Sequence, residues 1–142
     1  MRESGVLMHI TSLPGPYGVG TMGKQAFAFV DFLKKAGQRF WQILPLTPTG
    51  YGDSPYQSCS TYAGNHYLID LDLLIQEGLL KQEEVSAIDW GWREDKVDFG
   101  ILYNNRTKVL RIAYGRFEDG RRWMHSAGST AAGCRTLRCL WR

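Results

Sequence analysis

Residues 49–65, with the sequence TGYGDSPYQSCSTYAGN, combine three tyrosines with many short polar side chains. The tyrosines are Tyr51, Tyr56 and Tyr62, and the polar residues are Asp53, Ser54, Gln57, Ser58, Ser60 and Asn65. Sugars present apolar ring faces edged with hydroxyls, so a sugar site needs an aromatic platform beside short hydrogen-bonding groups. The same mixture also fits a well-packed polar loop whose tyrosines cap a core. The residues by themselves leave both interpretations open.

Carboxylates decide whether such a site could also cleave or transfer glycosides. That chemistry usually needs two carboxyl groups flanking the bond, about 5–5.5 Å apart in retaining enzymes. Asp53 is the one carboxylate within residues 49–65. Asp70 and Asp72 are expected to share a face of a short strand or turn, and His9 is expected to be packed or hydrogen-bonded rather than catalytic. The remaining nearby acidic residues are typical of solvated helix or loop charges: Glu83, Glu84, Glu94 and Asp95. We therefore expect no catalytic residue and no metal site.

The motif G-x-G-x-x-G occurs once, from Gly18 to Gly23, and opens a helical pattern. A dinucleotide site requires its first glycine at the tip of the preceding strand and an acidic residue at the end of the second strand. Here two prolines separate the strand from Gly18, and the second strand ends without a carboxylate. Loop geometry at the start of the helix explains these glycines better than a nucleotide does.

The elements that must position these residues form a strand–helix–strand pattern. Residues 5–10 and 39–44 are short apolar runs typical of buried strands. Residues 24–37 between them have apolar side chains at helical spacing, with Lys34 and Lys35 in the last turn and Gly37 after it. This order predicts a βαβ unit with two parallel neighbouring strands, hence an α/β fold.

A long loop over residues 45–66 follows the second strand, at the end where α/β folds place their binding loops. Beyond it we expect a short extended piece over residues 67–71 and short helices over residues 72–77 and 81–87. The longest helical pattern covers residues 97–115.

Charge and cysteine usage divide the chain near residue 117. Residues 1–117 hold 12 basic and 12 acidic side chains, whereas residues 118–142 hold five arginines against Glu118 and Asp119. The three cysteines are odd in number and show no CxxC spacing, which is typical of a reducing compartment. We expect no secretory signal, because no long apolar run follows the first residues, and the longest apolar runs are too short to span a membrane. We therefore expect a cytoplasmic protein.

Apolar periodicity stops in residues 118–142, and arginine, alanine, glycine, cysteine and tryptophan crowd together. We interpret this tail as disordered or as the out-of-frame translation of a longer gene. An alternative is a basic-tail protein that contacts nucleic acid or anionic surfaces. Its arginines lack any recognisable binding motif, so we expect no nucleic-acid partner and no membrane.

Three stretches resemble a known family: residues 4–20 (SGVLMHITSLPGPYGVG), residues 36–58 (AGQRFWQILPLTPTGYGDSPYQS) and residues 63–65. They are similar to the amylomaltases, the 4-α-glucanotransferases of glycoside hydrolase family 77. The resemblance covers residues 3 to about 117 without a visible gap, and residues 50–58 are its most specific part.

The resemblance implies a (β/α)₈ TIM barrel, of which this chain carries the first βαβ unit and an inserted helical segment. It implies transfer of α-1,4-glucan segments between maltooligosaccharides by a retaining double displacement, without a metal or organic cofactor. Tyr56 matches the tyrosine that lines the sugar subsite of the covalent intermediate. Ser54 and Gln57 flank it, and Tyr51 matches an aromatic residue at a remote glucan site.

The family's three catalytic carboxylates lie beyond the matching part, and a barrel of this type needs about 250 residues. We therefore expect residues 1–117 to be an incomplete N-terminal portion, inactive by itself, followed by a non-homologous tail over 118–142. Two parallel strands also leave edges and a face uncovered, which predicts a marginal or self-associating chain. The alternative function is a stand-alone α-glucan-binding module that uses Tyr51, Tyr56 and Tyr62. The oligomeric state does not follow from the sequence.

Overall fold

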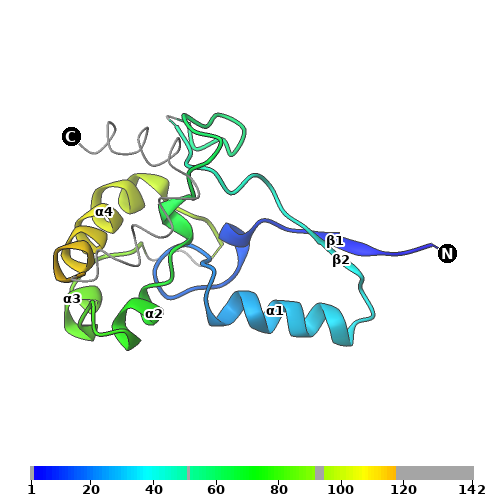
Figure 1. Ribbon diagram of the computed structural model, residues 1–142, viewed down its shortest axis with the longest axis horizontal. Helices are drawn as coiled ribbons and strands as arrows, with labels where there is room; N and C mark the ends of the chain where they lie inside the picture. The colour runs from blue at the N-terminus through cyan, green and yellow to red at the C-terminus, as the bar shows by residue number, and fades with distance from the viewer. Residues whose placement is uncertain (1, 51, 92–94, 118–142) are drawn as a thin grey trace.

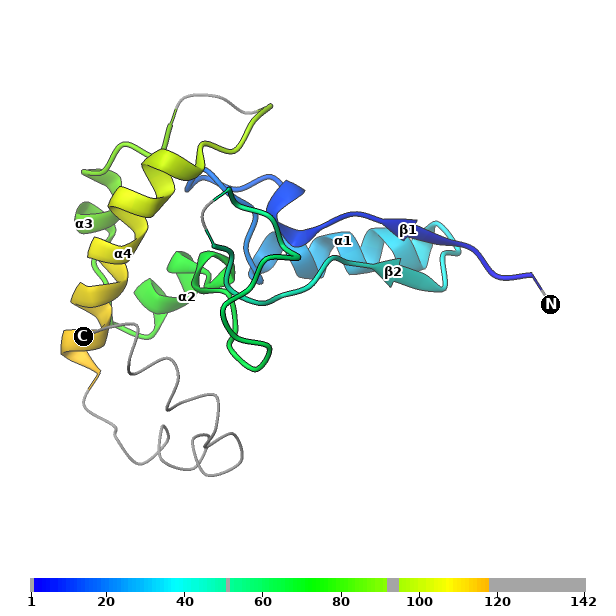
Figure 2. The same ribbon diagram turned by 90° about the horizontal axis from the view of Figure 1, so that it is seen from above.

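The computed structural model describes residues 2–50, 52–91 and 95–117. A strand–helix–strand arm occupies one end of the molecule, and three helices gather at the other (Figure 1). The segment that joins β2 to these helices lies between the two ends, as the view from above also shows (Figure 2). The predicted tail over residues 118–142 lies outside the described residues. Within them, no helix is long and apolar enough to cross a membrane.

The arm is a parallel βαβ unit, as the sequence predicts. Strand β1 (Gly5–Leu7) pairs with β2 (Phe40–Gln42), with Gly5 opposite Phe40. Helix α1 (Lys24–Lys35) connects them and runs alongside the sheet (Figure 1). The helix ends in a Schellman motif, because Gly37 has a φ of 71° and the Gln38 N–H donates to the Leu33 carbonyl at 2.9 Å. The predicted α/β class and parallel pairing are therefore confirmed.

The two strands are shorter and more exposed than the sequence predicts. Leu7 is 61% exposed and Phe40 is 59% exposed, so the expectation of two buried strands is wrong for this chain. The physical reason is that, among the described residues, each strand pairs only with the other. Helix α1 packs on the sheet through Phe29, whose ring lies 5.0 Å from that of Trp41 between centroids. Ile10 leaves the predicted strand for the 3₁₀ helix η1 (Ile10–Ser12), where it is buried.

Three α-helices follow the long loop, close to where the sequence predicts them. They are α2 (Leu71–Gln76), α3 (Gln82–Ser86) and α4 (Phe99–Arg116). Asp98 begins α4, because its Oδ1 accepts a hydrogen bond from the Ile101 N–H at 3.0 Å.

Residues 67–71 do not form the extended piece that the sequence predicts. His66–Leu68 form a 3₁₀ helix, η2, and Leu71 already begins α2. Side-chain caps explain the difference. The Asn65 Oδ1 accepts from the Tyr67 N–H at 2.9 Å, and the Asp70 Oδ1 accepts from the Leu73 N–H at 3.0 Å.

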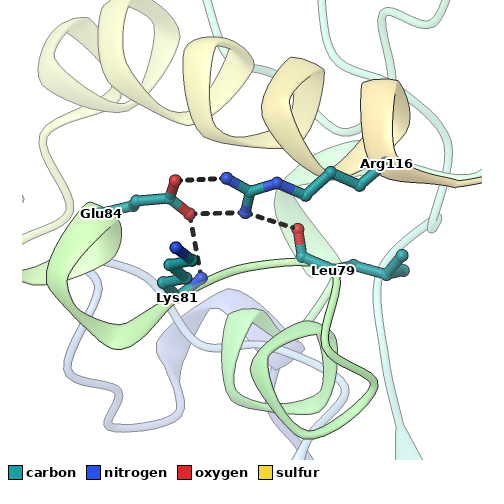
Figure 3. Close-up of polar contacts among 4 residues, drawn as sticks. All are labelled: Leu79, Lys81, Glu84 and Arg116. Atoms are coloured by element: carbon teal, nitrogen blue, oxygen red, sulfur yellow. Dashed lines mark hydrogen bonds and ion pairs between the residues drawn. The ribbon is translucent and has the colours of Figure 1, made fainter.

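The larger hydrophobic core belongs to the helical end of the molecule. Its buried members are Tyr17, Val19, Tyr67, Leu71, Leu80, Val85, Trp90, Leu102, Val109 and Ala113. At the edge of this core, Arg116 forks onto Glu84 and also donates to the Leu79 carbonyl (Figure 3). Because Glu84 also accepts from the Lys81 N–H, one carboxylate joins the start of α3 to the end of α4.

Candidate glucan-binding loop

The glycines of the G-x-G-x-x-G motif are packing positions. Gly18 has a φ of 74°, and a Cβ there would overlap the carbonyl oxygen of Trp90. A Cβ on Gly20 would overlap the carbonyl oxygen of Ile10. These close approaches require glycine for the loop to fold back on its neighbours. The geometry supports the loop interpretation of the motif.

The loop that carries the tyrosines leaves the C-terminal end of β2 and returns at Asn65. It is closed at its base, because the Asn65 N–H donates to the Leu46 carbonyl at 2.9 Å. A second contact narrows it further out, where the Gly50 N–H donates to the Gln57 carbonyl at 3.1 Å. Two main-chain bonds at different depths therefore shape the loop.

A compact turn forms the tip between these contacts. The Gln57 N–H donates to the Ser54 carbonyl at 3.1 Å, and the Tyr56 N–H donates to the Ser54 Oγ at 3.4 Å. Asp53 has a φ of 58°, in the left-handed region that asparagine and aspartate tolerate better than most residues. With its backbone fixed in this way, Tyr56 projects a side chain that is 73% exposed.

The structure brings three of the four predicted sugar-binding residues together. Ser54, Tyr56 and Gln57 share this one turn, with Tyr56 and Gln57 exposed and Ser54 half-buried. The fourth, Tyr51, lies outside the described residues. Tyr62, further along the loop, is 75% exposed. Exposed tyrosines on a hydrogen-bonded loop favour an aromatic platform over tyrosines that cap a core, the other interpretation that the sequence left open.

The side of the loop facing the helices is held by buried polar groups. Asn65 is 7% exposed and caps η2, and Tyr67 within η2 is 4% exposed. Burial is the main cause that raises the pKa of Tyr67, and the negative charge of Asp53 adds to it.

The other candidate acidic groups have structural partners. Asp70 caps α2 with one oxygen, and its Oδ2 accepts a hydrogen bond from the Thr21 Oγ1 at 2.6 Å. Asp72 accepts a hydrogen bond from the Tyr17 hydroxyl, and burial together with this bond raises the pKa of Tyr17 to about 12. These contacts join α2 to the segment that precedes α1, so both carboxylates serve the fold.

His9 lies just beyond β1, at the start of η1, and not inside a strand. It is half-buried, and its Nδ1 is buried without a hydrogen-bond partner among the described residues. Burial lowers the pKa of this imidazole. The expectation that His9 is packed holds, but the predicted strand position does not.

Sequence reasoning missed Arg106, which is 0% exposed. Its Nη2 donates to the Ile69 carbonyl and its Nε to the His66 carbonyl at 3.5 Å. A signal was present: the buried residues of α4 are Leu102, Arg106, Val109 and Ala113. An arginine at the apolar spacing of a helix indicates a buried cation with a structural partner.

The described residues contain no group of three or more histidine, cysteine, aspartate or glutamate side chains that could hold a metal ion. Cys59 is a free, exposed thiol. What the loop offers chemically is an aromatic face with hydroxyl, amide and carboxylate groups beside it, which suits the binding of a sugar.

Comparison with known proteins gives consistent results. The family model described as 4-alpha-glucanotransferase (Glyco_hydro_77) matches residues 8–131. The 4-alpha-glucanotransferase of Clostridium butyricum is 47% identical over 129 residues, covering 82% of this chain and 26% of that protein. The Thermus thermophilus 4-alpha-glucanotransferase is 52% identical over 118 residues, covering 83% and 23%. The chain thus spans about a quarter of the length of these curated relatives.

A solved structure is similar to this chain over most of its length. The amylomaltase from Streptococcus agalactiae in complex with acarbose superimposes with a TM-score of 0.83 at 49% identity. The match covers 92% of this chain and 26% of that one. Since the family model also matches most of the sequence, this chain belongs to glycoside hydrolase family 77, the 4-α-glucanotransferases.

Proposed function

We propose that this chain is the N-terminal part of a (β/α)₈ glucanotransferase barrel and that its loop over residues 47–65 binds α-1,4-glucans. The enzyme of which it forms part would transfer α-1,4-glucan segments between maltooligosaccharides. The observation that carries this proposal is the exposed Tyr56, fixed on a hydrogen-bonded turn beyond the end of β2 in a chain of this family. Binding loops of barrel enzymes occupy that end of the strands.

Ser54 and Gln57 complete the proposed subsite. A pyranose stacked on the Tyr56 ring presents its hydroxyls at the edge, where short polar side chains can reach them. Gln57 is exposed and carries both donors and acceptors, whereas the Ser54 Oγ already accepts from the Tyr56 N–H. We expect Gln57 to contact the sugar and Ser54 to set the turn. Tyr51 is proposed to serve a separate glucan contact.

The catalytic carboxylates are proposed to come from outside this chain. Asp53 is the one carboxylate of the loop, and Asp70 and Asp72 are held by Thr21 and Tyr17. A retaining transfer needs two carboxyl groups about 5–5.5 Å apart across the sugar bond. The chain by itself should therefore release no glucose from maltotriose, and disproportionation by the purified chain would contradict this part of the proposal.

A chimeric enzyme tests the function directly. Residues 8–117 would replace the matching segment of the Streptococcus agalactiae amylomaltase, to which the chain is 49% identical. The chimera is expected to convert maltotriose into glucose and longer oligosaccharides. A chimera that folds, as shown by a cooperative thermal transition, and yet stays inactive would refute the proposal.

A stand-alone glucan-binding module is the second candidate, favoured by the high exposure of Tyr56 and Tyr62. It predicts saturable binding of maltoheptaose by the 142-residue chain, lost in Tyr56→Ala. Calorimetric titration of the chain distinguishes the candidates, because a barrel part without its remaining subsites should bind maltoheptaose only weakly. The proposal includes a cytoplasmic location and no nucleic-acid or membrane partner.

The boundary at residue 117 also stays a proposal, with 118–142 as a tail foreign to the barrel. The family model's match extends to residue 131, past this boundary. Sequencing the encoding DNA across codon 117 and translating all three forward frames is the test. Barrel-like sequence in another frame would support the boundary, whereas the same tail in independent intact genes would refute it.

A further inference from the structure

Helix α4 carries a charged residue where its neighbours predict an apolar one. Leu102, Arg106 and Val109 lie on the buried face of the helix, and each is 0% exposed. A buried guanidinium is costly unless it is hydrogen-bonded. The hydrogen bonds of the Arg106 guanidinium therefore indicate its role in the fold.

The guanidinium joins the two ends of η2. Its Nε donates to the His66 carbonyl at 3.5 Å, and its Nη2 donates to the Ile69 carbonyl. His66 is the first residue of η2, and Ile69 is the residue that follows it. A planar fork of donors can hold two carbonyls at once, which a single ammonium group cannot do in the same way.

The segment held in this way closes the loop that carries Tyr56. The Leu68 N–H donates to the Asn65 carbonyl at 3.1 Å, and the Tyr67 N–H donates to the Asn65 Oδ1. Asn65 in turn donates its own N–H to Leu46 across the loop base. A continuous set of hydrogen bonds thus runs from Arg106 through η2 to the start of the loop.

We propose that Arg106 is a positioning residue: by clamping both ends of η2 it fixes Asn65 and so sets the base of the glucan-binding loop. This inference rests on the proposed function of that loop. Arg106 is not proposed to contact the sugar. It acts on the sugar site indirectly, by holding Asn65 in place.

The charge of Arg106 fits this role at neutral pH. Burial lowers its pKa to about 10, and the negative charge of Asp70 opposes that shift. The side chain therefore remains a cation under physiological conditions. The Arg106 Nη1 is buried without a hydrogen-bond partner among the described residues. The hydrogen bonds to the His66 and Ile69 carbonyls are therefore what mainly offsets the free-energy cost of burying the guanidinium.

Hydrogen–deuterium exchange on the chimeric enzyme tests the clamp. In Arg106→Met, exchange in peptides covering residues 62–70 should rise about tenfold, as expected for the loss of hydrogen bonds to a charged group. Peptides covering α1 should keep their rate. Arg106→Lys, which retains the charge but not the fork, should fall between the wild type and Arg106→Met. Arg111→Met, at an exposed position of the same helix, is the matched control and should change neither region.

Kinetics on the same variants provide the second measurement. A displaced loop should lower kcat/KM for maltotriose about tenfold in Arg106→Met, mainly through KM, with partial recovery in Arg106→Lys. Equal acceleration of exchange in α1 and in residues 62–70 would overturn the proposal, because it would show a general loss of stability. Unchanged exchange in residues 62–70 would also overturn it.

The two proposals fail in different ways. If the wild-type chimera is folded but inactive, the proposed function fails, and the exchange comparison still decides whether Arg106 fixes the loop base. If the chimera is active and Arg106→Met exchanges and reacts like the wild type, only the positioning role fails.

Discussion

The two ends of the molecule bury their large apolar side chains to different extents. At the helical end, α2, α3 and α4 bury Leu71, Val85 and Leu102 completely against one another. In the βαβ arm, large apolar side chains on the strands and on α1 remain in contact with solvent: Leu7, Phe27, Val30, Phe32 and Phe40. A short apolar run thus predicts a strand, but its burial depends on neighbours that the run does not encode.

The sharpest test of this difference is a matched pair of leucine truncations. Leu102→Ala should lower the free energy of unfolding by about 2–5 kcal/mol, because it leaves a cavity in the helical core. Leu7→Ala should change it by no more than about 0.5 kcal/mol, because that side chain is already exposed. Urea unfolding of the chain, followed by circular dichroism, measures both. Similar losses would mean that the arm is as well packed as the helices.

The junction between the two regions gives the next largest effect. Gly20 follows Val19 of the helical core. It also packs against Ile10 and Leu13, which together with Leu68 form a second, smaller buried cluster. Gly20→Ala should destabilise the chain by about 1–3 kcal/mol, because the new methyl group overlaps the Ile10 carbonyl.

Gly64→Ala is the control for that change, since a Cβ there meets no atom within 4 Å in the described structure. It should shift the free energy of unfolding by no more than about 0.5 kcal/mol. The same urea titration measures both variants. If Gly20→Ala and Gly64→Ala change the free energy of unfolding equally, the two clusters do not pack closely around Gly20.

The smallest effect concerns the ion pair at the surface of the helical end. The hydrogen bonds from Arg116 are the main cause that lowers the pKa of Glu84 from 4.5 to about 2, and the Lys81 N–H contributes next. A lowered carboxyl pKa stabilises the fold above pH 4.5, and this contribution is lost as the pH falls towards 2. Because both side chains of the pair are partly open to solvent, the effect should be slight.

The measurement is the urea midpoint at pH 6 and at pH 3. The wild type should lose more stability between these values than Glu84→Gln does. Glu83→Gln, at the exposed neighbouring position, should behave like the wild type. If Glu84→Gln shows the full wild-type pH dependence, the pair does not stabilise the helical end.

Sequence reasoning found most of the elements because their signals are local. The end of α1 is encoded by Lys34, Lys35 and Gly37, which are close together in the sequence. The apolar spacing of α4 is likewise encoded within the helix itself. The errors at η2 and at the strands have non-local causes. Asn65 and Asp70 replace an extended segment with caps, and Leu7 is exposed because, among the described residues, β1 pairs with β2 alone.

In the candidate site, too, local features could be predicted from the sequence and non-local ones could not. The residue types of the loop left a sugar platform and a core-capping loop both open, and the structure has Ser54, Tyr56 and Gln57 on one turn. Arg106 was missed because its partners are main-chain carbonyls about forty positions earlier, which leave no mark in the sequence. The arginine on an apolar helix face was the one available sign.

The most direct test of the central claim compares two tyrosines in the chimeric amylomaltase. Tyr56→Ala removes the proposed sugar platform, and Tyr114→Ala removes a tyrosine on α4 that is 79% exposed. If Tyr56 stacks on the glucan, kcat/KM for maltotriose should fall by about tenfold to a hundredfold in Tyr56→Ala and stay unchanged in Tyr114→Ala. Full activity in Tyr56→Ala, or equal losses in the two variants, would contradict the claim that this loop binds the substrate.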